Sequence, residues 1–161
     1  MTPKVYIEST IISYLTSWRS PQLVMAGNQE STRSWWDEQR HKFELFVSEV
    51  VIDEASAGDR AASHRRLEAI KDIPVLLVDD SARQLAKELV NRTPLPETAR
   101  ADSWHIAAAT VNGMDYLLTW NCRHIANATL QKTMATICQE AGYQMPIICT
   151  PLELIGEYEN D

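Results

Sequence analysis

Two acidic residues lie at positions where the sequence pattern predicts burial, and buried positions seldom carry a charge. Glu8 directly follows the apolar run of residues 5–7. Glu54 comes four residues after Val50 and three after Val51, so a helix here would place its carboxylate on the same apolar face. A carboxylate on a core-facing surface is costly unless it is paired or bound to a metal ion.

A third acid lies in the alanine-rich segment "ARADSWHIAAAT". Asp102 precedes His105 by three residues and Ile106 by four, so it would point inward near the start of a helix. Purely structural roles are also possible. Asp102 could complement the helix dipole, and Glu8 could cap the next helix in competition with Ser9 or Thr10.

Three acids from separate segments predict a cation site if the fold brings them together. Like charges in one pocket repel and raise one another's pKa values. Divalent cations relieve that repulsion, and hard oxygen ligands favour Mg²⁺ or Mn²⁺. Spacing along the chain does not show whether the three converge.

The elements that would position these acids alternate between strands and helices over a single domain of residues 1–161. Short apolar runs predict strands at 5–7, 43–47, 75–78, 116–120 and 147–149. Helical patterns cover 9–17, 28–40, 49–58, 59–71, 81–91, 98–112 and 127–141, with a loop marked by Pro21 and Gly27 and a short terminal helix from Pro151. Such alternation predicts an α/β fold with a parallel sheet covered on both faces.

The ends of the predicted strands point to the place of the site. In open parallel sheets, ligands bind beyond the carboxyl ends of the strands. Glu8 follows the first strand and Asn121 follows the fourth. Both side chains are therefore expected in the same region.

Composition bounds the class of protein. The chain has 161 residues, of which 45% are hydrophobic and 23% charged, as in ordinary globular domains. No apolar run approaches the ~20 residues that span a bilayer, and no signal peptide is recognised, so the cytoplasm is expected. Three cysteines without C-x-x-C spacing make a disulfide framework unexpected, and Cys122 with His124 lacks the second pair of a zinc site. The net charge of −7 neither indicates nor excludes nucleic-acid binding.

Four motifs in order resemble the PIN-domain nucleases, in particular the VapC-like toxins of type II toxin–antitoxin pairs. "VYIESTIISYL" is similar to the first-strand motif of a branch with a "YIETT" signature. "VSEVVIDEASAGD" and "ARADSWHIAAAT" resemble the helices of the second and third acids, and "DYLLTWNCRHIAN" resembles the fourth-strand motif. The resemblance covers about residues 4–150. It implies a PIN-like three-layer sandwich, with a central parallel sheet of about five short strands.

Two positions depart from the family pattern. Glu8 stands where the first strand usually ends on Asp, and Asn121 stands where a further Asp is usual. An amide oxygen can still ligate Mg²⁺ or hold a metal-bound water, but it brings no charge. Weaker binding of a second metal ion is therefore expected.

The resemblance implies a metal-dependent endoribonuclease. Glu8, Glu54 and Asp102 would coordinate one or two Mg²⁺ or Mn²⁺ ions, assisted by Asn121. Arg123, beside the site, is expected to contact RNA. His124 is expected either to contact RNA phosphate or to pack at a helix start, and His105 is expected to be a packed core residue.

The resemblance also implies partners, and a second reading remains open. A small antitoxin and a homodimer are expected, with Trp18 or Trp36 as candidates for the dimer interface. The alternative is a catalytically weak PIN-like domain that acts mainly by binding RNA or a protein. Glu8 and Asn121 are the features that favour this alternative.

Overall fold

Five short parallel strands form the centre of the molecule. The computed structural model describes residues 1–156. The strands are β1 (Lys4–Ile7), β2 (Glu44–Ser48), β3 (Val75–Leu76), β4 (Tyr116–Leu118) and β5 (Ile147–Cys149). They lie in the order β3-β2-β1-β4-β5, and every pairing is parallel.

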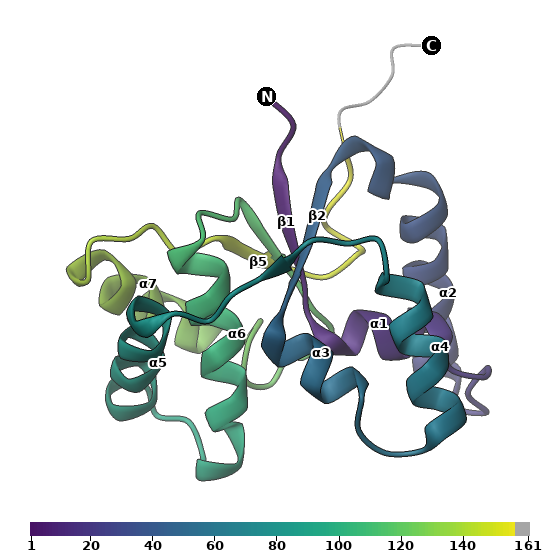
Figure 1. Ribbon diagram of the computed structural model, residues 1–161, viewed down its shortest axis with the longest axis horizontal. Helices are drawn as coiled ribbons and strands as arrows, with labels where there is room; N and C mark the ends of the chain where they lie inside the picture. The colour runs from purple at the N-terminus through teal and green to yellow at the C-terminus, as the bar shows by residue number, and fades with distance from the viewer. Residues whose placement is uncertain (157–161) are drawn as a thin grey trace.

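Helices cover both faces of the sheet. On one side lie α1 (Ser9–Thr16), α2 (Leu23–Glu38), α3 (Glu49–Ala55) and α4 (Arg60–Ile70), which pack against one another (Figure 1). On the other side α5 (Asp80–Arg92) packs against α6 (Arg100–Val111) and α7 (Ala128–Glu140). Two 3₁₀ turns, η1 (Arg40–Lys42) and η2 (Glu97–Ala99), complete the elements of the described residues. The predicted α/β fold class, with a central parallel sheet between helical layers, is confirmed.

The central strand explains why the sheet forms. Val5, Tyr6 and Ile7 of β1 are wholly buried, because β1 pairs with β2 on one edge and β4 on the other and both its faces are covered. Strands buried on both faces read as continuous apolar runs. The chain leaves β1 toward β2 and β3, and later returns to add β4 and β5 on the other side. The reversal between β1 and β4 is where such sheets bind ligands.

Local signals fix most of the helix ends. Ser48 and Asp59 accept hydrogen bonds from the backbone N–H groups of Val51 and Ala62, which confirms both as N-caps of α3 and α4. Gly113 follows α6 with φ of 71°, in the left-handed region that favours glycine. The helix before it therefore ends where the sequence predicts.

Three predicted features are wrong. Gly27 lies inside α2, which begins at Leu23, because one glycine costs a helix only about 1 kcal/mol and buried Trp35 anchors this one. β3 is two residues long, because it pairs with β2 alone at an edge of the sheet. Residues 151–153 form a turn instead of a helix.

The turn has a simple cause. The carboxylate of Glu153 accepts hydrogen bonds from the backbone N–H and the hydroxyl of Thr150, at 3.1 and 2.9 Å. The indole of Trp35 donates to the carbonyl of Leu154 at 2.7 Å. These three hydrogen bonds hold the segment in place. No helix among residues 1–156 is long and apolar enough to cross a membrane.

Candidate active site

Glu8 is buried and held by three hydrogen bonds at the carboxyl end of β1. Its Oε2 accepts from the backbone N–H of Thr10 at 3.0 Å, from the hydroxyl of Thr119 at 2.8 Å and from the hydroxyl of Thr10. The expected alternative, a carboxylate that caps the following helix, is thus observed. The other oxygen, Oε1, lies 4.0 Å from Nε2 of His105. Glu8 therefore caps α1 with one oxygen and faces the candidate site with the other.

A buried hydrogen-bonded chain runs from β2 to α3 through His105. The hydroxyl of Tyr6 lies 2.7 Å from the Ser48 hydroxyl and 2.7 Å from Nδ1 of His105. Nε2 of His105 is hydrogen-bonded to Oε1 of Glu54. Because an ionised carboxylate only accepts, Nε2 carries the hydrogen; Tyr6 then donates to Nδ1 of the neutral imidazole, or accepts from Nδ1 and donates to Ser48 when His105 is protonated. Every member of the chain then has a partner.

Glu54 differs from the prediction in one respect. Its side chain is 42% exposed, although the helical pattern placed it on a core-facing surface with Val51. The buried residues of α3 are Val51 and Ala55, four residues apart, so the core-facing stripe runs through this pair and Glu54 lies at its margin. Glu54 therefore reaches His105 from the solvent side.

Asp102 and Asn121 meet through His124. Oδ2 of Asp102 lies 3.1 Å from Nδ1 of His124. Oδ1 of Asn121 accepts from the backbone N–H of His124 at 3.0 Å, which fixes the turn after β4. Asp102 also lies in the first turn of α6, as expected for a residue that complements the helix dipole.

The charges in this region perturb one another. Burial raises the pKa of Asp102, and the nearby His105, His124 and Asn121 only partly offset that effect. For His105, burial disfavours the charged form. The hydrogen bond to Glu54 and the charges of Glu8, Glu54 and Asp102 outweigh burial and raise its pKa. Three carboxylates therefore act on one buried imidazole.

The structure brings the predicted acids together around His105 and leaves two other residues at the margin. Glu8 and Glu54 approach the same nitrogen, and Asp102 is near enough to affect its pKa. Arg123 is exposed and directly precedes His124 in the chain. His124 contacts Asp102, so its predicted contact with RNA stays a prediction.

The oxygen-rich donors fit a hard divalent cation in their chemistry. Carboxylates and an amide are the ligands that Mg²⁺ and Mn²⁺ take. The hydroxyl of Ser9, next to Glu8, is buried without a hydrogen-bond partner among residues 1–156. Within that range, however, no three His, Cys, Asp or Glu side chains already stand as a metal cluster. In the described arrangement, the Nε2–H group of His105 donates a hydrogen bond to the carboxylate of Glu54.

Sequence reasoning missed the role of His105 and its support. The expectation of a buried histidine is confirmed, since His105 is 1% exposed, but its bonds to Tyr6 and Glu54 were not foreseen. One signal was available: His105 lies one helical turn after Asp102 and so shares its face. Tyr6 and Ser48 gave no signal, because strand residues 42 positions apart reveal no pairing.

Comparison with known proteins identifies the fold. A scan of the sequence against protein-family models finds no match, and neither does a search of curated proteins. Among solved structures, VapC20 of Mycobacterium tuberculosis, a toxin that cleaves the sarcin–ricin loop, matches with a TM-score of 0.59 at 14% identity, over 77% of this chain and 95% of VapC20. The VapBC2 complex of Rickettsia felis, bound to a DNA fragment from its promoter, matches with a TM-score of 0.58 at 10% identity, over 91% of this chain and 98% of the matched chain.

Proposed function

Because the chain has the fold of VapC-like PIN domains, we propose that it is a metal-dependent endoribonuclease and the toxin of a toxin–antitoxin pair. One observation supports this most: Glu8 and Glu54 approach the same nitrogen of His105, and Asp102, one helical turn before His105 on α6, contacts His124 after β4. Such a cluster of carboxylates at a topological switch point is suited to holding a divalent cation.

Glu8, Glu54 and Asp102 would hold Mg²⁺ or Mn²⁺, with Asn121 assisting. When bound, the ion supplies an activated water and charge stabilisation for phosphodiester hydrolysis. Glu8 is the fixed member, because Thr10 and Thr119 hold one of its oxygens. Glu54 is the adjustable member, because it is half-exposed and would exchange its bond to His105 for the cation.

The neighbouring side chains would orient the reaction. His105, held by Tyr6, limits the positions that Glu54 takes. Arg123, directly before His124 in the chain, is exposed and carries a cation suited to an RNA phosphate. His124 holds Asp102 and is the second candidate for a phosphate contact.

The experiment is cleavage of RNA by purified variants, with and without metal. Glu54→Gln and Asp102→Asn should each lower the rate by about 100-fold or more, the loss typical of groups that stabilise transition-state charge. Asp53→Asn is the matched control, because it removes an exposed carboxylate next to Glu54 on the same helix. EDTA should abolish cleavage, and added Mn²⁺ should restore it. Cleavage that survives both substitutions and EDTA would contradict the proposal.

A second function, binding without efficient catalysis, has its own support. Among residues 1–156 no ready cluster of three metal ligands stands in place, and Asn121 brings no charge. Calorimetry with Mn²⁺ separates the two functions. A nuclease takes up the ion and loses that uptake in Glu8→Gln, whereas a binding module shows no uptake in either protein.

Two protein partners belong to the same proposal. The matched Rickettsia structure is of a VapBC complex, which supports a small antitoxin as partner for this chain. A cationic residue of that antitoxin would compete with metal at the acids. A homodimer is the second partner, and Trp18, Leu23 and Val24, all strongly exposed, are the candidates for its interface.

A further inference from the structure

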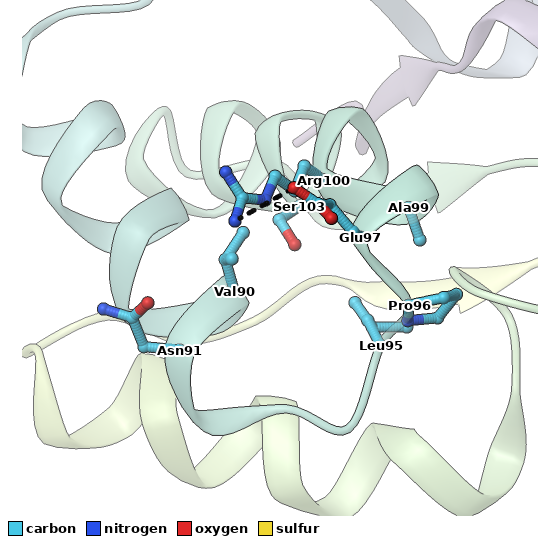
Figure 2. Close-up of a pocket in the computed structure, with 8 residues that line it drawn as sticks. All are labelled: Val90, Asn91, Leu95, Pro96, Glu97, Ala99, Arg100 and Ser103. Carbon is cyan, nitrogen blue, oxygen red and sulfur yellow. Dashed lines mark ion pairs between the residues drawn. The ribbon is translucent and has the colours of Figure 1, made fainter.

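A cavity of about 380 Å³ lies between the end of α5 and the start of α6, outside the acid cluster. Its volume is within the range of small-molecule sites, about 300–1,000 Å³. It is lined by Val90, Asn91, Leu95, Pro96, Glu97, Ala99, Arg100 and Ser103 (Figure 2).

The buried hydroxyl of Ser103 is the feature of this cavity that indicates a ligand. Ser103 is wholly buried, and its Oγ has no hydrogen-bond partner among residues 1–156. Figure 2 shows this hydroxyl pointing between Val90 of α5 and Leu95 and Pro96 of the loop. A buried hydroxyl without a partner costs free energy, and a bound group that pairs with it recovers that cost.

The other walls of the cavity describe the ligand. Val90, Leu95 and Pro96 offer apolar contact to the faces of a flat ring, and the hydroxyl of Ser103 can donate to and accept from its edge. Arg100 at the rim is 64% exposed and pairs with Glu97 only at 3.8 Å, so its guanidinium is free to take an anion. A nucleotide combines a ring with polar edges and an anionic phosphate.

The position of the cavity connects it to the acids. Ser103 directly follows Asp102 in the first turns of α6, where the helix dipole also favours an anion. A ligand in the cavity thus lies against the helix that carries one of the candidate metal ligands. Single-stranded RNA presents unstacked bases that proteins bind by their edges.

We infer that this cavity binds one nucleotide of the RNA strand, with its base against Ser103 and its phosphate at Arg100, and so selects where the strand is cut. This inference rests on the proposed function for its substrate. Binding of nucleotides is measurable without cleavage, so the two proposals can fail separately.

The test measures binding of AMP, GMP, CMP, UMP, ribose 5-phosphate and inorganic phosphate to the full chain in EDTA, by calorimetry. At least one nucleoside monophosphate should bind more tightly than ribose 5-phosphate or phosphate. Ser103→Ala should weaken that binding roughly three- to tenfold, the loss expected for one hydrogen bond. Val90→Phe, which fills the cavity, should weaken it further.

The matched control is Thr93→Val. Thr93 is also buried with an unpartnered hydroxyl, but it does not line the cavity, so its removal should leave binding unchanged. Thermal unfolding should show Ser103→Ala no less stable than the wild type, because it loses an unpaired group. Arg100→Gln removes the guanidinium that is proposed to bind the phosphate, and Arg83→Gln is its matched control. Both arginines are exposed and paired with an acid three residues earlier.

The outcomes separate the two proposals. Equal binding of nucleotides and phosphate, no nucleotide binding, or equal effects of Ser103→Ala and Thr93→Val would overturn the cavity proposal while leaving cleavage intact. Nucleotide binding that depends on Ser103 in a protein that cleaves no RNA would support the cavity and overturn the nuclease.

Discussion

At the scale of single residues, His105 is the centre of the candidate site. It joins a hydroxyl pair in the core to a carboxylate at the surface, with both ring nitrogens engaged. The surroundings of His105 shift its pKa: burial lowers the pKa, and three nearby acids raise it by more. Two predictions belong to this residue and its support.

The first concerns pH. The folded state raises the pKa of His105 above its ordinary value of about 6.5, so it holds the proton more tightly than the unfolded chain does. The resulting stabilisation is complete below pH 6.5 and is lost as pH rises through the folded-state pKa. In EDTA, the free energy of unfolding should therefore fall with rising pH above about 6.5, and fall less in His105→Gln. His64→Gln, on an exposed position of α4, should keep the wild-type slope; equal slopes in all three proteins would contradict the prediction.

The second concerns Tyr6. Its hydroxyl is buried between two polar partners, and burial raises its pKa, so it stays protonated and able to donate. Tyr6→Phe leaves Ser48 and His105 without that partner and should lower the free energy of unfolding by about 1–3 kcal/mol. Denaturation in urea measures the change. Tyr143→Phe, at a half-buried ring, is the control, and an equal loss in both variants would mean that the network adds nothing.

At the scale of elements, two glycines predict opposite effects of the same substitution. Neither would bring an added Cβ within 4 Å of another group, so only backbone conformation matters. Gly113→Ala places alanine at φ of 71° after α6 and should destabilise the protein by about 1–2 kcal/mol. Gly27→Ala, inside α2, should stabilise it by about 0.5–1 kcal/mol. Changes of the same sign would contradict one of the two predictions.

The elements also show what the sequence allows one to predict. Caps at Ser48 and Asp59 and the strand from Ile147 to Cys149 follow from residue type and local pattern, and the structure has them. The exposure of Glu54 and the length of β3 depend on which neighbours cover them, and a periodic pattern contains no such information. The partners of His105 lie 51 and 99 residues away in the chain, beyond any local signal.

At the scale of the whole molecule, exposed apolar side chains near the start of α2 predict an interface. Leu23 and Val24 are 88% and 77% exposed, which is unusual for two adjacent large apolar residues. Leu23→Glu should convert a homodimer to a monomer, measured by light scattering after gel filtration. Leu77→Glu places the same charge on a different exposed leucine and should leave the mass unchanged. A wild-type monomer would contradict the proposed homodimer.

The order of the strands in the sheet determines when, during synthesis of the chain, the site can form. β1 is made first, but one of its two neighbours, β4, is made after residue 115, and Thr119 beyond it holds Glu8. His124, which contacts Asp102, likewise comes from the last third of the chain. A chain still growing on the ribosome has Thr10 beside its first acid from the start, but it lacks Thr119, the third group that holds Glu8, until residue 119 has been made. In the nuclease proposed above, the contacts between the candidate acids would therefore form late in synthesis.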